Sequence, residues 1–314
     1  DTEAPAFTVP SDVTICRDNS CLYNADPSTT GDITNESDNC DADLDVSYAD
    51  DLTNLIDCDN FGYITRTWTL TDDCGNQTSK DQIIFVEPLP KVLLDPQSDT
   101  LCDNETTSIE ITSLTSPEYA VRFSYTYDAP NADSLIFNIN GAQTDLPAGF
   151  TIQDNIDNIS LDAQSVLLIV TPYSVDNNDN PRCSGVNDTT ILWINPQPII
   201  RVSADDTICY EETGTSNTIT ITNPNTTRGT WSYDITVSYP PGVSGILNNQ
   251  NNLTNTSLAD NILNTTPDVQ PVNYLFTPNI NPDDGGADCE NGDDTIITVW
   301  INPQPQIEVN VDDT

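Results

Sequence analysis

A six-residue sequence occurs twice in this chain, at an interval of 107 residues. Trp-Ile-Asn-Pro-Gln-Pro stands at 193–198 and again at 300–305. The dipeptide Asp-Thr keeps the same interval at 99–100, 206–207 and 313–314. Two pairs of cysteines keep it within one residue: Cys102 with Cys209, and Cys183 with Cys289. A fixed period indicates an array of repeated units, and a unit of this length is the size of a small domain. The repeat therefore predicts tandem, separately folded modules.

Pairs of prolines mark the joints between these modules. They are Pro88 and Pro90, Pro196 and Pro198, and Pro303 and Pro305, each pair following a strand-like run. Two prolines at a joint favour an extended, stiff connection. We expect modules over 1–88, 89–197 and 198–305, with 306–314 beginning a further repeat. Modules held in a fixed relation by stiff joints should form a rod.

Short runs of alternating polar and apolar residues indicate an all-β chain. Such runs cover 63–70, 218–221, 232–239 and 296–301, and turn-forming residues bound them. Several short strands with turns between them predict antiparallel β-sandwiches. No segment keeps a helical period, so we expect almost no helix. The tryptophans lie on expected strands, which favours the sandwich core over a carbohydrate-binding platform: Trp68, Trp193, Trp231 and Trp300.

The charge balance excludes several classes of function. The net charge is −42, with only eight Lys and Arg residues. Nucleic-acid binding needs clustered cations, and an anionic membrane would repel this chain. No apolar run is long enough to insert into a membrane. The sequence contains no histidine, which excludes Ser-His-Asp and Cys-His catalysis within the chain. We therefore expect no catalytic residues.

Nine cysteines at regular positions predict disulfides and an oxidising, extracellular setting. We expect the bridges Cys102–Cys183 and Cys209–Cys289, each closing a loop of about 80 residues within one module. The first module has five cysteines, which leaves one over. There the sequence favours Cys40–Cys74 and leaves open the pairing of Cys16, Cys21 and Cys58.

One acidic segment offers the oxygen ligands that calcium prefers. Asp38, Asp41, Asp43 and Asp45 lie within eight residues, three of them at alternate positions. Weaker candidates are Asp176 with Asp179, and Asp283 and Asp284 with Asp288. The alternative is a solvated acidic loop, which is common in a chain of this composition. Calcium is the only cofactor that the sequence suggests.

The first module and the later two modules resemble two different types of known protein module. The first opens Asp-Thr-Glu-Ala-Pro-Ala-Phe at 1–7 and closes Trp-Thr-Leu-Thr-Asp-Asp-Cys-Gly-Asn at 68–76; it resembles the bacterial hyalin-repeat (HYR-like) module, an immunoglobulin-like sandwich. The later two carry Asp-Thr-Leu-Cys at 99–102 or Asp-Thr-Ile-Cys at 206–209, and the Trp-Ile-Asn-Pro-Gln-Pro ending. They resemble PKD-like modules of surface adhesins in gliding Bacteroidota, although the Trp-Asp-Phe-Gly-Asp-Gly signature is absent.

Taken together, the chain resembles a segment of the SprB-type gliding-motility adhesins. The resemblance implies tandem immunoglobulin-like antiparallel β-sandwich modules in an elongated rod, exported by type IX secretion to the cell surface. An Asp-Ser/Thr-apolar pattern also resembles the O-glycosylation motif of Bacteroidota. It makes candidate glycosylation sites of Thr100, Ser134, Thr207 and Thr295; the alternative is a simple start of a strand.

Three functions from different classes are compatible with these features. The first is a non-enzymatic structural repeat segment of a giant cell-surface adhesin filament, used in adhesion and gliding motility. Its partners would be neighbouring modules and, through regions outside this chain, surface polysaccharide and the gliding or secretion machinery. The second is a tethering or carbohydrate-binding accessory region of a secreted multidomain hydrolase. The third is a carbohydrate-binding module that acts on its own.

Overall fold

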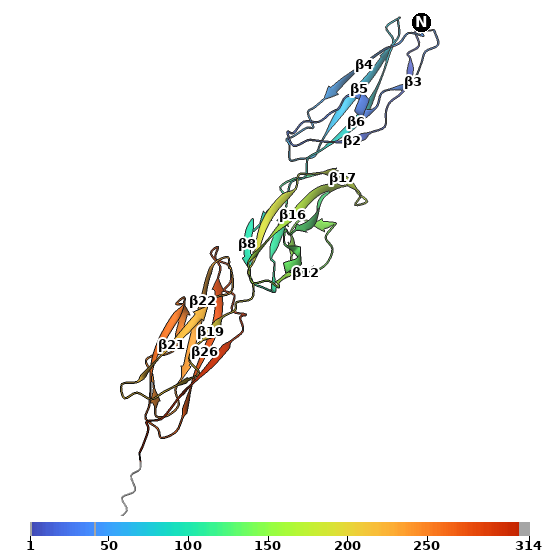
Figure 1. Ribbon diagram of the computed structural model, residues 1–314. Coiled ribbons are helices and arrows are strands. Elements are labelled where there is room, and N and C mark those ends of the chain that lie inside the picture. Colours follow the sequence, from blue (N-terminus) through green and yellow to red (C-terminus); the bar gives the residue numbers. More distant parts are fainter. Residues whose placement is uncertain (1, 41, 308–314) are drawn as a thin grey trace, which may run out of the picture.

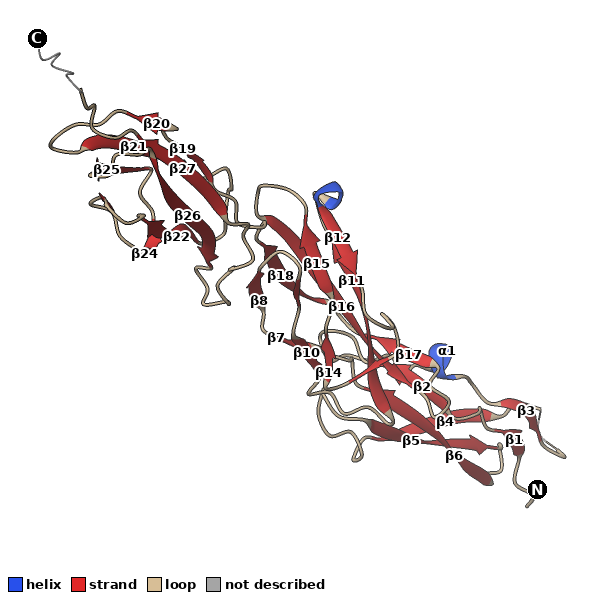
Figure 2. Ribbon diagram, turned by 90° about the horizontal axis from the view of Figure 1, so that it is seen from below, coloured by secondary structure: helices blue, strands red, loops and turns tan. Residues whose placement is uncertain are grey.

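A computed structural model describes residues 2–40 and 42–307. The chain forms a rod in which three β-sandwich modules follow one another end to end (Figure 1), which confirms the expected all-β class and elongated shape. Helix is limited to α1 (Pro27–Thr30) and the 3-10 turn η1 (Ala132–Ser134) within the described residues (Figure 2).

The first module is built on one long antiparallel pair. Its main sheet has the order β2-β6-β5-β4, and β1 pairs with β3 on the other side. The strands are β1 (Ala6–Thr8), β2 (Val13–Cys16), β3 (Thr34–Ser37), β4 (Asp45–Asp51), β5 (Gly62–Thr71) and β6 (Gln77–Glu87). Every second residue of β5 is buried, as its alternating sequence predicts. Among them, Trp68 is 1% exposed and lies in the core, as expected.

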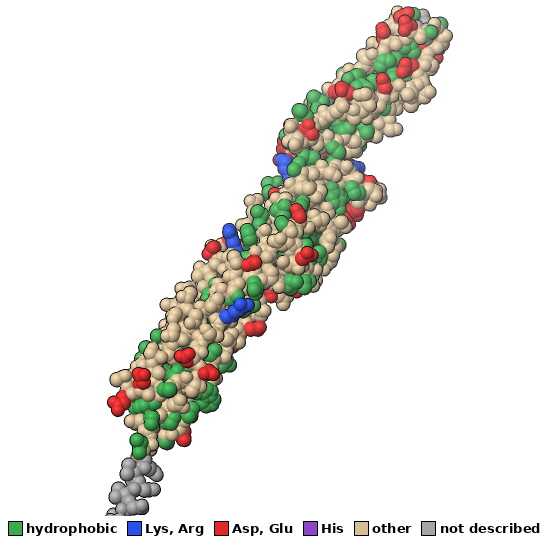
Figure 3. Space-filling view, in the orientation of Figure 1, with side chains coloured by type: hydrophobic (Ala, Val, Ile, Leu, Met, Phe, Trp, Pro, Cys, Tyr) green, Lys and Arg blue, Asp and Glu red, His purple; other side chains and the backbone are tan. Residues whose placement is uncertain are grey.

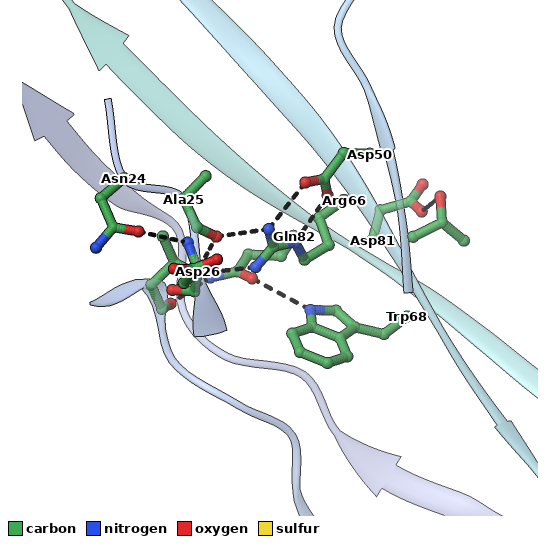
Figure 4. A network of polar contacts seen from close by, with 10 residues as sticks. Asn24, Ala25, Asp26, Asp50, Arg66, Trp68, Asp81 and Gln82 are labelled. Atoms are coloured by element: carbon green, nitrogen blue, oxygen red, sulfur yellow. Dashed lines mark hydrogen bonds and ion pairs between the residues drawn. The ribbon is translucent and has the colours of Figure 1, made fainter. Parts of the chain in front are cut away.

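One buried position of β5 is a cation. Arg66 is 1% exposed and makes two bonds to the Asp50 carboxylate, at 2.7 and 2.9 Å. It also donates to the Ala25 carbonyl (Figure 4) and to the Thr30 hydroxyl, and its guanidinium lies over the Tyr48 ring. These partners replace the water that burial removes. The Asp50 hydrogen bond is the main cause that raises the pKa of Arg66.

The second module has three sheets around one core. Their orders are β13-β11-β16-β18-β8 with β17 beside β16, β14-β10-β7, and β12-β15-β9. The strands are β7 (Leu93–Asp95), β8 (Ser98–Leu101), β9 (Glu105–Thr106), β10 (Ile109–Thr112), β11 (Ala120–Asp128), β12 (Leu135–Asn138), β13 (Leu146–Pro147), β14 (Phe150–Ile152), β15 (Asn155–Asn158), β16 (Gln164–Val175), β17 (Pro181–Ser184) and β18 (Asp188–Ile194). Burial alternates along β16 up to its last two residues, which are both buried, and this strand supplies much of the core.

The third module repeats this plan with two sheets, ordered β20-β27-β26-β22-β24 and β19-β21-β25-β23. Its strands are β19 (Arg201–Ser203), β20 (Thr207–Ile208), β21 (Thr215–Thr222), β22 (Thr230–Ser238), β23 (Val243–Ser244), β24 (Gln250–Leu253), β25 (Ser257–Asn264), β26 (Gln270–Asn281) and β27 (Thr295–Ile301). Trp231 packs against its core, but Trp300 is 44% exposed, so the expectation of a core position was wrong for Trp300.

An early strand of each module runs parallel to the last one. The pairs are β2 with β6, β8 with β18 and β20 with β27. A parallel pair places the ends of both strands at the same edge of the sheet. The residue that follows the early strand therefore lies where the module ends and the next one begins.

A buried carboxylate bonded to tyrosines recurs in the two related modules, and the sequence did not reveal it. Asp154 and Asp260 are both fully buried. Asp154 accepts a 2.6 Å hydrogen bond from the Tyr125 hydroxyl, and Asp260 accepts bonds of 2.6 Å from those of Tyr239 and Tyr274. Burial is the main cause that raises the pKa of each tyrosine, and the hydrogen bond to the carboxylate is the second cause. Each cluster joins the two halves of a sandwich through satisfied polar groups.

Candidate functional site: the module junctions

A disulfide crosses the junction between the first and second modules. Cys16 ends β2, and its sulfur is bonded to that of Cys183 in β17, with 5.8 Å between the Cα atoms. A second contact lies at the same junction, where Ser116 pairs with the segment at Asn60. The Phe61 N–H donates to the Ser116 carbonyl at 2.9 Å, and the Ser116 N–H donates to the Asp59 carbonyl at 2.7 Å. The first two modules are therefore joined by one covalent and one backbone-bonded contact.

A buried acid lies at this first junction and is paired across it. Glu87, the last residue of β6, is fully buried and accepts a 3.0 Å bond from Arg182 of the second module. Arg182 also contacts Glu118 at 2.5 Å, so one cation serves two carboxylates. Burial raises the pKa of Glu87, and the bond from Arg182 opposes that rise. Removing this carboxylate from water is costly, and Arg182 offsets part of that cost.

The second junction has the same two parts. Cys102 follows β8 and is bonded to Cys289 of the third module, with a Cα–Cα distance of 5.3 Å. Beside the disulfide, the Thr100 hydroxyl donates to Asp284 at 2.5 Å. The matching backbone contact joins Ala163 of the second module to Thr226 of the third. The Ala163 N–H donates to the Thr226 carbonyl at 2.7 Å. Both junctions thus combine a disulfide with a backbone contact to an early loop of the next module.

The ending Trp-Ile-Asn-Pro-Gln-Pro lies inside the second junction. Asn195 is fully buried; its side chain donates to the Arg228 carbonyl at 3.0 Å and accepts from the Arg228 N–H at 2.7 Å. The Arg228 guanidinium lies over the Trp193 ring, 5.1 Å from its centre. The side chains of this repeated ending therefore hold the next module in place.

Glycines allow the linkers to lie close to the module that they enter. A Cβ added to Gly185 would lie 1.9 Å from the Pro90 carbonyl oxygen, and one added to Gly292 would lie 2.8 Å from that of Pro198. Either contact is too short for a side chain. The linker prolines are buried at these contacts, which limits bending of the rod.

The two intramodular bridges expected for the later modules were wrong. Cys102 is bonded to Cys289 instead of Cys183, and Cys289 is therefore not bonded to Cys209, whose exposed thiol is free. The reason is the parallel pairing of β8 with β18. Cys183 precedes β18 whereas Cys102 lies beyond its far end, and seven residues of strand span roughly 20 Å. Disulfide geometry requires Cα atoms within about 7 Å.

The remaining cysteines lie in the first module. Cys21 is bonded to Cys58, with 5.4 Å between their Cα atoms. The bridge expected between Cys40 and Cys74 is not among the three disulfides of the described residues, and both side chains are exposed. The sequence left Cys16, Cys21 and Cys58 unassigned, and the fold assigns all three.

The acidic segment at 38–45 does not assemble a metal site among the residues that the structure describes. No group of three metal-ligating side chains is found in that part of the chain. Asp41 lies outside the described residues. Asp38 accepts the Cys40 N–H at 2.8 Å, which forms a local turn, and Asp43 and Asp45 are exposed. Calcium binding at this segment stays a prediction.

The weaker calcium candidates have protein partners. Asp179 forms a 3.1 Å ion pair with Arg122, and Asp176 accepts the backbone N–H groups of Asn178 and Asn180. Asp284 takes part in the second junction, as described above, and Asp288 accepts a bond from Asn281 at 2.6 Å. These carboxylates therefore support loops and a junction.

The candidate glycosylation sites differ in access. Thr100 is 2% exposed and bonded across the second junction, so the folded rod excludes a glycan there. Thr207 is exposed, and Ser134 and Thr295 are half-buried. Modification at these three positions stays a prediction.

The surface carries acidic side chains along the visible face, with few basic ones (Figure 3). Among the described residues, no helix is long and apolar enough to cross a membrane.

No protein-family profile matches this chain, and no curated protein matches its sequence. Solved structures similar to it include the I-band fragment I67–I69 from titin, with a TM-score of 0.43 and 12% identity over 97% of this chain and 100% of the titin chain. Mouse cadherin-23 EC22–24 has a TM-score of 0.36 and 10% identity over 96% of this chain and 99% of the cadherin chain. The D00–D0 domain of intimin has a TM-score of 0.32 and 11% identity over 66% of this chain and 99% of its own.

Proposed function

We propose that this chain is a non-enzymatic structural segment of a cell-surface adhesin filament, and that its modules transmit tension along a stiff rod. The observation that supports this function most directly is that a disulfide crosses each of the two junctions. A pull on one module is then passed to the next through a covalent bond and through buried linkers.

The same disulfides support an extracellular location, because such bonds persist in oxidising compartments. A net charge of −42 keeps a protruding filament soluble and separate from its neighbours. The absence of histidine from the sequence supports a role without Ser-His-Asp or Cys-His catalysis.

The finer assignment rests on the resemblance to SprB-type adhesins. On this proposal the filament serves gliding motility, reaches the surface by type IX secretion, and contacts surfaces or polysaccharide through regions outside this chain. Calcium bound at Asp38, Asp41, Asp43 and Asp45 would reduce the self-repulsion of the first module.

An in-frame deletion of residues 1–305 from the parent protein tests this function in cells. We expect the protein to remain at the surface while attachment to glass and gliding speed fall, since the filament is shortened. A matched control replaces only the exposed Asp81 by Asn and leaves both properties unchanged.

A different result would identify an accessory region of a hydrolase. The parent protein would then cleave a glycan or peptide substrate, and attachment and gliding would be unaffected by the deletion. That result would overturn the adhesin proposal.

A further inference from the structure

The third module ends in a face that matches the covered end of the second module. We define the junction face as Thr100, Cys102, Trp193 and Asn195 of the second module. The terminal face is the set of residues found 107 positions later: Thr207, Cys209, Trp300 and Asn302. The junction face is covered by the third module. The terminal face has no module on it among the described residues.

The backbone has the same conformation at both faces. Thr100 pairs in parallel with Trp193, and Thr207 pairs in parallel with Trp300. The Asn195 N–H donates to the Leu101 carbonyl at 2.8 Å. The corresponding N–H of the third module, that of Asn302, donates to the Ile208 carbonyl at 3.0 Å. The terminal face is therefore already folded in the form that the junction face uses.

The two faces differ in their exposure to water. Thr100 and Cys102 are 2% and 8% exposed, whereas Thr207 and Cys209 are both exposed. The difference extends to the aromatic ring, because Trp193 is half-buried beneath Arg228 and Trp300 is 44% exposed. Asn195 is fully buried and Asn302 only half-buried. Each residue of the junction face is thus less exposed than the matching residue of the terminal face.

We propose that the terminal face docks a further module of the same kind, and that a cysteine in the loop before the last strand of that module forms a disulfide with Cys209. The existing junction specifies the rest of the occupant. It would carry a carboxylate for the Thr207 hydroxyl, as Asp284 serves Thr100. It would also carry an arginine whose guanidinium covers Trp300 and whose backbone bonds Asn302.

The disulfide forms by thiol–disulfide exchange. The Cys209 thiol and the incoming thiol lose two protons and two electrons in forming one S–S bond. An oxidoreductase that holds a reactive disulfide takes up the two protons and the two electrons, and its own disulfide becomes two thiols. The repeat supports a module as the occupant, because both existing junctions pair an early cysteine of one module with a late cysteine of the next.

The test duplicates the third module within the whole chain. A second copy of residues 199–305 is inserted between Pro305 and Gln306, which keeps the 107-residue period, and the copy's own Cys209 is replaced by Ser. After oxidation, non-reducing peptide mapping should find Cys209 bonded to the copy's Cys289, with Cys102–Cys289 retained. A matched control with Cys289→Ser in the copy should leave Cys209 fully reactive to iodoacetamide.

A second measurement separates docking from chance proximity. In a glutathione redox buffer, the effective concentration of the Cys209 thiol and the copy's Cys289 thiol for each other can be compared with that of Cys102 and Cys289. We expect the two values to agree within about tenfold. Both should exceed the roughly millimolar value of two thiols joined only by a flexible tether. The proposal is overturned if Cys209 stays reactive while the other disulfides are intact. It is also overturned if Cys209 instead links two copies of the chain through Cys40 or Cys74, or if its effective concentration is only millimolar. None of these outcomes depends on adhesion.

Discussion

Disulfides that cross both junctions should limit how far the chain extends under force. If the chain is pulled at its termini until every module unfolds, tension follows the shortest covalent route. That route leaves the backbone at Cys21, crosses to Cys58, follows the backbone to Cys102 and crosses to Cys289. About 90 of the 314 residues lie on it, and at ~3.5 Å per residue they extend to roughly 320 Å. The fully reduced chain extends to roughly 1,100 Å.

Cysteine variants change this length by amounts that depend on which bridges exist. Replacing Cys102 and Cys289 by Ser sends the route through Cys16–Cys183, with about 150 residues and roughly 520 Å. Removing the bridges at both junctions leaves about 275 residues and roughly 970 Å. The matched control removes only the intramodular bridge Cys21–Cys58 and gives about 120 residues, roughly 430 Å.

Single-molecule force spectroscopy with handles at both termini measures these contour lengths. The order should be wild type, control, Cys102/Cys289 variant and double-junction variant, with the reduced protein longest. If the oxidised wild type extends as far as the reduced protein, or if removing Cys102 and Cys289 does not lengthen it, the junction disulfides do not transmit tension and the reasoning fails.

Three further predictions concern the first module and the first junction. Asp50→Ala leaves Arg66 buried without its carboxylate and should lower the free energy of unfolding by about 3 kcal/mol in denaturant titrations, whereas Asp81→Ala at an exposed position should change it by less than about 0.5 kcal/mol. The folded chain binds a proton at Glu87 more tightly than the unfolded chain, because burial raises the pKa of Glu87. Wild type should therefore lose stability relative to Glu87→Gln as the pH rises above about 4.5. A free energy of unfolding of wild type that stays constant or increases with pH, relative to that of Glu87→Gln, would contradict this. If calcium binds the acidic segment, EDTA should lower the melting temperature of the first module and Asp43→Asn should remove most of that effect; an equal response to sodium chloride would show a solvated loop.

Much of the architecture follows from local pattern. The alternation in 63–70 predicts a strand with one buried face, and β5 has that burial. The same pattern gave no reason to expect a cation in the buried register, because Arg66 acquires its partners from segments 16 and 41 residues away. The carboxylates Asp154 and Asp260 were missed for the same reason. Each looks like an ordinary acidic residue in sequence, and only the folding of distant strands brings tyrosines to it.

The sequence by itself determined the period, the all-β class and the positions of the cysteines. The tertiary structure decided which cysteines meet. The repeat cannot distinguish a bond from Cys102 to Cys183 from one to Cys289, because both candidate partners recur with nearly the same interval. The choice depends on β8 running parallel to β18, which carries Cys102 to the end of its module and against the next one. Strand direction results from long-range pairing and is not written in any local segment. The same pairing makes Thr100 a buried junction residue while its repeat Thr207 stays exposed.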